Sequence, residues 1–315
     1  MHLLFEPGFF ASGPVRTAVV IGGVAAVVSA VVGVFTVVRS QSFAGHALTD
    51  IATTGGSGAF YLGFNPLAGF IGGGVVGAGA MDLIGVQRVR SRDVATGIVL
   101  GAATGLAALF LYLDTTSSAT TGATQQILFG SIFTIDRSTV PVVVVLSVVT
   151  LVGMAVIRRP LLLHSVSPEL ATVRGVAGRG IGLAFMLALA VSVGLSSVAI
   201  GSILSTALLI GPAAAALRVT RSIGAATVVA CGLGIATTWL GILLAYDSAD
   251  WVRSGQGLPV SFFIVVLTFL SYLVTGIPAV RRLAGRRGRH PAPADRAPAD
   301  RAPAAPAAPA GPAEG

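Results

Sequence analysis

The chain has 315 residues, of which 54% are apolar and 10% are charged, and its mean hydropathy is +0.89. Soluble domains carry about 25% charged residues, so this composition excludes a soluble globular protein and indicates a polytopic membrane protein. The net charge of +8 rests on arginine without lysine, and most arginines lie in short loops or the tail, as membrane topology requires. The charge therefore does not argue for nucleic-acid binding.

Nine apolar segments follow one another along the chain, and each is long enough to cross a bilayer as a helix. They lie at residues 15–38, 43–63, 67–86, 94–113, 139–157, 181–198, 200–217, 223–246 and 259–280. The second segment is the weakest, and eight spans would remain if it were re-entrant. The predicted fold class is therefore all-α, with about nine transmembrane helices.

The two ends of the chain differ from the membrane domain, which we place at residues 15–280. Residues 1–14 form a short lead that suits a membrane-surface helix. Residues 281–315 are rich in Pro, Ala and Arg, a composition that favours an extended, disordered chain. With nine spans and the N-terminus outside, the outer loops hold only Arg16, Arg137 and Arg253, so the positive-inside rule places the tail in the cytoplasm.

The segment at residues 161–180 is too polar to span. We expect the fifth span to end at Ile157, before the sequence Arg-Arg-Pro. Ser167 is a suitable N-cap, with Pro168 at the first helical position and Glu169 in the first turn. This pattern predicts a short helix at the inner membrane surface.

Two metal-ligating side chains lie in the second span. His46 and Asp50 are four residues apart, which puts both on one face of a helix, and both types bind divalent metals. Glycines at 55, 56 and 58 are expected to loosen this helix, and such interruptions point to binding sites in transporters. The alternative is an interfacial loop whose polar residues are merely solvated.

Other polar or special residues have simpler expectations. Asp82 has no evident partner and should reach the membrane interface, and His164 should be exposed to solvent. Gly211 and Pro212 lie inside a span and follow Gly201, so this region is either a hinge beside a pathway or a site of close helix packing.

The sequence contains no nucleotide-binding or catalytic pattern. A Walker A motif is absent, and the Gly-rich stretch 69–80 lacks the Lys-Ser/Thr of a phosphate loop. Its small residues are expected to let helices approach closely. We therefore predict a protein that is not an enzyme and has no cofactor of its own.

Five motifs in sequence order resemble the permease subunit of metal-ion ABC importers of the zinc, manganese or iron type. They lie at 42–48 (SFAGHAL, after Arg39), 128–133 (LFGSIF), 167–176 (SPELATVRGV), 200–216 (IGSILSTALLIGPAAAA) and 258–267 (LPVSFFIVVL). The resemblance covers about residues 10 to 280.

Three departures accompany this resemblance. The family's Gly-Asp-Ala-Leu-Ser-His order is Gly-His-Ala-Leu-Thr-Asp here, so acid and imidazole change places; Ser167 replaces an aspartate; and a glycine near Ser261 is missing.

The resemblance implies a multi-pass protein of the plasma membrane that imports a divalent metal, with zinc or manganese ahead of iron. It implies three partners: a separate ATPase subunit that hydrolyses ATP, an extracytoplasmic metal-binding protein and a second copy of the permease. His46 and Asp50 would bind the ion, while Pro168, Glu169, Ala171 and Gly175 would couple the permease to the ATPase. A stand-alone secondary transporter or channel is the alternative.

Overall fold

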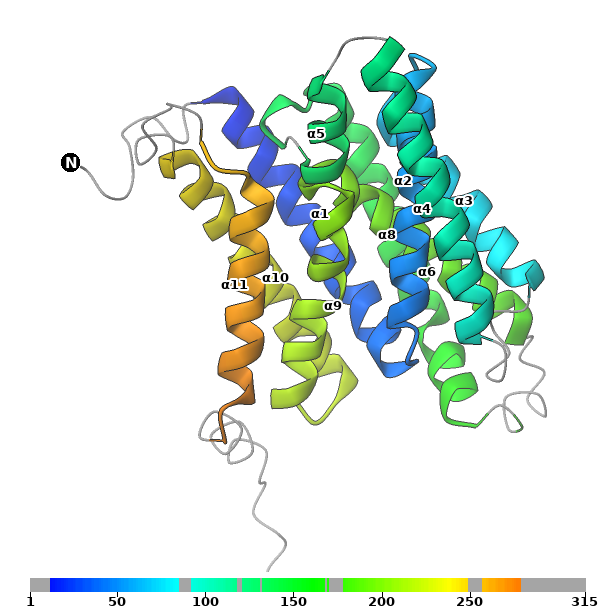
Figure 1. The fold of residues 1–315 in the computed structure, drawn as a ribbon. Helices are drawn as coiled ribbons and strands as arrows, with labels where there is room; N and C mark the ends of the chain where they lie inside the picture. Colours follow the sequence, from blue (N-terminus) through cyan, green and yellow to red (C-terminus); the bar gives the residue numbers. More distant parts are fainter. Residues whose placement is uncertain are drawn as a thin grey trace, which may run out of the picture.

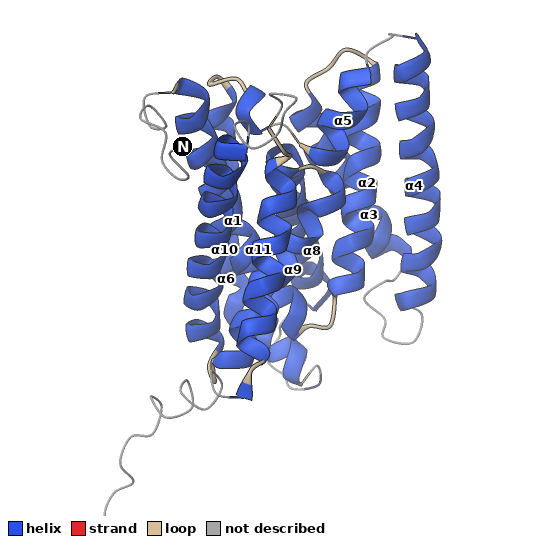
Figure 2. Ribbon diagram, turned by 60° about the vertical axis from the view of Figure 1, so that its left-hand side comes forward, coloured by secondary structure: helices blue, strands red, loops and turns tan. Residues whose placement is uncertain are grey.

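A computed structural model describes residues 12–84, 92–117, 121–130, 132–167, 169, 178–248 and 257–278. Within these ranges all regular structure is helical, as predicted, with nine long helices and two short ones (Figures 1 and 2). The long helices are α1 (Gly13–Val38), α2 (Ser42–Tyr61), α3 (Pro66–Ile84), α4 (Arg92–Ser117), α6 (Thr139–Val166), α8 (Gly178–Ile200), α9 (Ser202–Val219), α10 (Ile223–Asp247) and α11 (Val260–Gly276). The short ones are α5 (Thr121–Phe129) and the 3-10 helix η2 (Ile132–Thr134).

Seven of the described helices are long and apolar enough to cross a membrane by length and composition alone. The other two long helices are α2, which carries the polar residues of the second predicted span, and α11, which is a shorter apolar helix. The 20 residues of α2 would extend about 30 Å, which matches the hydrocarbon thickness of a bilayer. The tail and the first residues of the lead lie outside the described ranges, so the proposed domain boundaries stay predictions.

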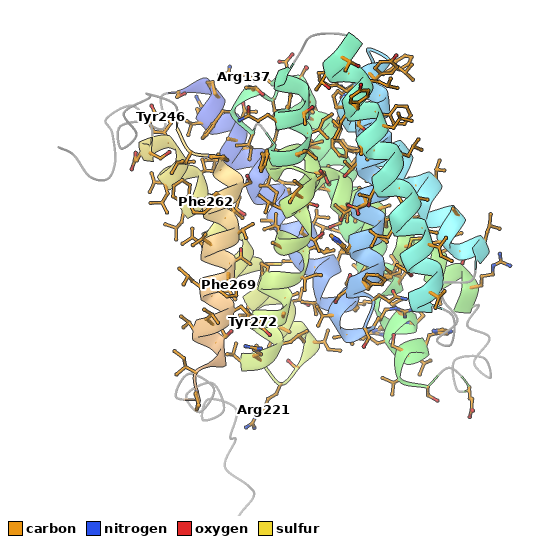
Figure 3. The ribbon with its side chains drawn as sticks, viewed as in Figure 1. Arg137, Arg221, Tyr246, Phe262, Phe269 and Tyr272 are labelled. Carbon is orange, nitrogen blue, oxygen red and sulfur yellow. The ribbon has the colours of Figure 1, made fainter. Side chains whose placement is uncertain are left out.

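Successive long helices run in opposite directions, so α1 begins at the upper end of the molecule in Figure 1 and α11 ends at the lower end. The arginines follow this alternation. Figure 3 shows Arg137 at the upper end and Arg221 at the lower end. Arg39, Arg158, Arg159, Arg179 and Arg218 belong to turns or helix ends on the same lower side. The positive-inside rule therefore predicts that the lower end is cytoplasmic, and this orientation stays a prediction.

The helices form two groups that α8 joins. In one group α2 packs between α3 and α4; in the other α1 packs against α9 and α10, with α11 outside them. Helix α8 contacts α3, α6 and α1, and its Ser196 hydroxyl lies 2.6 Å from that of Ser29 on α1. This buried pair satisfies two polar groups inside an otherwise apolar core.

Helix α2 is continuous, which corrects the expectation that its glycines would loosen it. Gly55 lies against the backbone of Gly73 on α3, and Gly56 lies against the ring of Phe70. The small residues allow two helices to approach closely, and this packing compensates for the low helix propensity of glycine. The close approach predicted for the Gly-rich stretch 69–80 is present.

Helix α6 is longer than predicted, because it continues through Pro160 to Val166 instead of ending at Ile157. Proline removes one backbone hydrogen bond, but the next residue, Leu161, is fully buried. Burial of apolar side chains beyond the proline offsets the lost bond. Ser167 terminates this helix, with its N–H bonded to the Leu163 carbonyl.

The connection between α8 and α9 is a single residue, Gly201, so the two helices form a tight hairpin. Its φ of 84° lies in the left-handed region, and a Cβ atom there would overlap the backbone of Leu128 and Phe129. Gly130, with φ 75°, faces it from the end of α5. The two glycines let the turn pack backbone to backbone against α5.

Candidate functional site

His46 and Asp50 lie one turn apart on the same face of α2, as the spacing predicted. Helix α2 contacts α4 on one side and α9 on the other. The His46 side chain is exposed, whereas Asp50 is half-buried. The pair is therefore held on a continuous helix, and neither side chain is fully buried.

Hydroxyl groups from the neighbouring helices contact both side chains. The Nδ1 atom of His46 lies 3.3 Å from Oγ1 of Thr206 on α9, and that hydroxyl also lies 3.3 Å from Oγ1 of Thr49. On the other side, the Thr104 hydroxyl of α4 donates to Oδ2 of Asp50 over 2.9 Å. Each potential ligand is thus oriented by a threonine from a different helix.

Sequence reasoning did not identify Thr104 or Thr206 as part of this site. Both are single hydroxyl residues in apolar helices, far along the chain from the pair. Their contacts to Asp50 and His46 span 54 and 160 residues of sequence. Only the position of Thr206 inside the 200–216 motif offered a signal, and that motif does not specify a partner.

A cavity of about 300 Å³ adjoins Asp50. Its polar lining consists of Asp50, Thr53, Thr104 and Ser202, while alanine and leucine side chains of α4 and α5 form most of the rest. The residues of α4 in this lining follow Thr104 along a helix that runs toward the upper end in Figure 1. The cavity therefore lies toward the upper end of the bundle from Asp50, and one carboxylate and three hydroxyls form the polar part of its lining.

The described part of one chain does not contain a complete set of metal-ligating side chains. Among the residues that the structure describes, there is no group of three or more His, Cys, Asp or Glu side chains that could hold a metal ion. As predicted ligands, His46 and Asp50 would number two, whereas zinc sites commonly use four. Further ligands would have to come from hydroxyls, water or a second chain.

The residues of the proposed hinge pack closely against neighbouring groups. Pro212 lies within the continuous helix α9 and is buried. A Cβ atom on Gly211 would overlap the side chain of Thr268 on α11. These contacts agree with close packing at Gly211, whereas Gly201 belongs to the turn before α9.

The structure describes one of the four proposed coupling residues. Glu169 is exposed, whereas Pro168, Ala171 and Gly175 lie outside the described residues. The structure supplies the partner of Asp82 that the sequence left open, since Nε of Arg179 lies 3.2 Å from its Oδ2. One nearby expectation was wrong: His164 is half-buried, because its ring lies against Gly178.

Comparison with known proteins identifies the family. The model of the ABC 3 transport family matches residues 14–275. The manganese import system permease protein ScaB of Streptococcus parasanguinis is 26% identical over 262 residues, covering 83% of this chain and 91% of that protein. The chelated iron transport system membrane protein YfeC of Yersinia pestis is 25% identical over 292 residues, covering 92% and 97%.

The fold is also that of a solved structure. PsaBC from Streptococcus pneumoniae, solved in complex with a Fab, superposes with a TM-score of 0.71 at 21% identity. The match covers 89% of this chain and 98% of that one. Because the family match spans most of the sequence and the described helices form a multi-span bundle, the chain belongs to the ABC 3 transport family and is a multi-pass protein of the plasma membrane.

Proposed function

We propose that this chain is the permease subunit of an ATP-binding-cassette importer for a divalent metal ion, with manganese as the first candidate. The observation that carries the proposal is the placement of His46 and Asp50 on one accessible face of α2, with Asp50 beside a cavity whose polar groups are its own carboxylate and three hydroxyls. Relatives named for manganese import and chelated iron transport support a metal cargo. Oxygen ligands suit manganese, whereas imidazole is also compatible with zinc and iron.

Four ligands would result if two copies met around a two-fold axis. An isologous interface presents the same residues from both sides, so each copy would supply its own His46 and Asp50. Two carboxylates in a membrane interior are costly alone, and a divalent cation between them would offset that cost. The pair in one chain thus supports a permease homodimer.

Energy would come from a partner, because the sequence has no nucleotide-binding motif. We assign ATP hydrolysis to a separate ATPase subunit that contacts the segment from Pro168 to Gly175, at the arginine-rich end. An extracytoplasmic binding protein would deliver the ion at the opposite end, above the cavity beside Asp50. Membership of an ABC transport family supports this complex over a stand-alone transporter or channel.

The test is metal uptake by cells that express the permease together with its ATPase and binding protein. At matched expression, His46→Ala and Asp50→Asn should each lower manganese uptake more than tenfold. Loss of a group that merely hydrogen-bonds to a metal ligand lowers metal affinity or activity about tenfold or more, and loss of the ligand itself should cost at least as much. Asp136→Asn is the matched control, since Asp136 is an exposed acid outside the site that accepts a bond from the Ser138 N–H. If both site variants kept wild-type uptake, the metal site would lie elsewhere, while the family assignment would stand.

A further inference from the structure

The turn between α1 and α2 is short and fixed by backbone hydrogen bonds. Only Arg39, Ser40 and Gln41 separate the two helices. Ser40 has φ 53°, and the Gln41 N–H bonds back to the Thr36 carbonyl over 2.9 Å, which is the pattern of a Schellman helix end. Gln41 is also buried, at 1% exposure. The first turn of α2 therefore has little freedom to move independently of this turn.

Arg39 joins this turn to two other helices. One terminal nitrogen of its guanidinium lies 2.9 Å from the Ser165 hydroxyl and 3.4 Å from the Leu161 carbonyl, both in the last turns of α6. The same group lies over the ring of Phe185 on α8, with the central carbon 5.4 Å from the ring centroid. Arginine suits this position because its planar cation can donate several bonds and stack on a ring at once.

The attached end of α6 leads directly into the segment proposed to contact the ATPase. Ser165 lies four residues before the exposed Glu169. The far side of that segment returns to the same place, since Gly178 at the start of α8 lies against the ring of His164. A force applied to the segment by an ATPase would thus reach the end of α6, where Arg39 is bound.

A second link at the lower end of the bundle, between α8 and α3, is weaker. Arg179 pairs with Asp82 at the end of α3, but its side chain is 74% exposed. Exposed ion pairs of this kind contribute little, because water and salt screen them. Arg39 is half-buried and combines hydrogen bonds with a ring contact, so it is the stronger of the two connections.

At the other end of the connection lies the candidate metal pair. Helix α2 begins at Ser42 and is continuous through His46 and Asp50, so the pair is about one and two turns from the Arg39 turn. We propose that Arg39 is a positioning residue that transmits movement of the ATPase-facing end of α6 to the metal-binding helix α2. This inference rests on the proposed function, both for the metal pair and for the ATPase contact.

The experiment uses the complete transporter, reconstituted in vesicles as permease, ATPase and binding protein. Manganese uptake and ATP hydrolysis are measured on the same vesicles, and manganese binding is measured on the purified permease. Arg39→Ala should lower the manganese moved per ATP by roughly fivefold or more, the lower end of ordinary coupling between two sites, while binding stays unchanged. Arg158→Ala, an exposed arginine earlier on α6, is the matched control and should keep the wild-type ratio.

Two further variants test the contact itself. Ser165→Ala should lower the manganese moved per ATP less than Arg39→Ala does. The double variant should show the same ratio as Arg39→Ala alone, because the effects of two residues that act through one contact are not additive. Arg39→Lys keeps a charged donor, so it should move more manganese per ATP than Arg39→Ala but less than the wild type. An unchanged ratio in Arg39→Ala would overturn the proposal.

A purely structural role would also overturn the proposal, and it would be visible as equal losses of manganese binding, thermal stability and uptake in Arg39→Ala. The proposed function fails in a different way. In that case His46→Ala and Asp50→Asn would leave manganese binding intact in a permease whose Arg39 is unchanged. The two failures are therefore separable, because one appears in the measurements on Arg39→Ala and the other in manganese binding by the His46 and Asp50 variants.

Discussion

Gly55 of α2 and Gly73 of α3 lie in backbone contact: a Cβ atom added to Gly55 would come within 2.7 Å of the Cα atom of Gly73. This approach sets the distance between the helix that carries His46 and Asp50 and its neighbour α3. It also explains why a glycine-rich segment can be a regular helix, since close packing compensates for low helix propensity.

The first prediction concerns this contact. Gly73→Ala should destabilise the protein by about 1–3 kcal/mol, because its Cβ would lie 2.8 Å from the Cα of Gly55 and force the helices apart. Thermal unfolding in detergent would measure the loss. Gly72→Ala is the matched control on the same helix, since nothing lies within 4 Å of its added methyl group. Equal stability of the two variants would contradict the role of the contact.

The second prediction concerns the hydroxyl partner of Asp50. Thr104→Val keeps the shape of the side chain but removes the donor to Oδ2, so manganese binding should weaken by roughly tenfold. Thr116→Val is the control, because the bonds of its hydroxyl within the described residues go to carbonyls of its own helix. The effect should be partial, since the Thr104 hydroxyl also lies 2.9 Å from the Leu100 carbonyl and has a single proton to donate. Titration of the purified permease with manganese would show wild-type affinity if Thr104 were irrelevant.

The helices and the polar pair could be predicted from the sequence, whereas their partners could not. Spans are determined by local hydrophobicity, and the four-residue spacing of His46 and Asp50 determines their common face. The contacts of Thr206 and Thr104 depend on how α9 and α4 pack beside α2, which no local pattern encodes. The same holds for the link from Arg179 to Asp82, which joins residues 97 positions apart.

The wrong predictions for the end of α6 and for the glycines of α2 had a different cause. A proline after two arginines is a strong local stop signal, yet α6 passes through it. The signal was outweighed by tertiary contacts, namely burial of Leu161 and the bond from Arg39 to its carbonyl. In α2 the glycines predict interruptions, because a local pattern contains no information about their packing partners on α3.

The third prediction concerns topology. In a Cys231→Ala background, Ser138→Cys should react with an impermeant maleimide in intact cells, because Ser138 is exposed at the end of the molecule where α6 begins. Arg221→Cys, exposed at the opposite end, should react only after permeabilisation, and so should a cysteine placed in the tail. Labelling of Arg221→Cys or the tail from outside would reverse the orientation given by the arginines.

The last prediction concerns the ATPase contact. Glu169 is an exposed acid just beyond the end of α6, at the arginine-rich end of the bundle. If its segment docks in a groove of the ATPase, Glu169→Arg places the opposite charge in that interface, and mismatched charges at an interface are costly. Transport should then fall by roughly tenfold relative to ATP hydrolysis, within the usual range of coupling between two sites.

The permease itself should remain folded in this variant, because an exposed side chain contributes little to stability. Unchanged manganese binding and thermal unfolding would verify this. Arg221→Glu serves as the control, since it reverses a charge on another exposed turn at the same end. If Glu169→Arg supported wild-type uptake per ATP, the coupling segment would have to lie elsewhere on this face, and the role of Arg39 would need to be tested from that new contact.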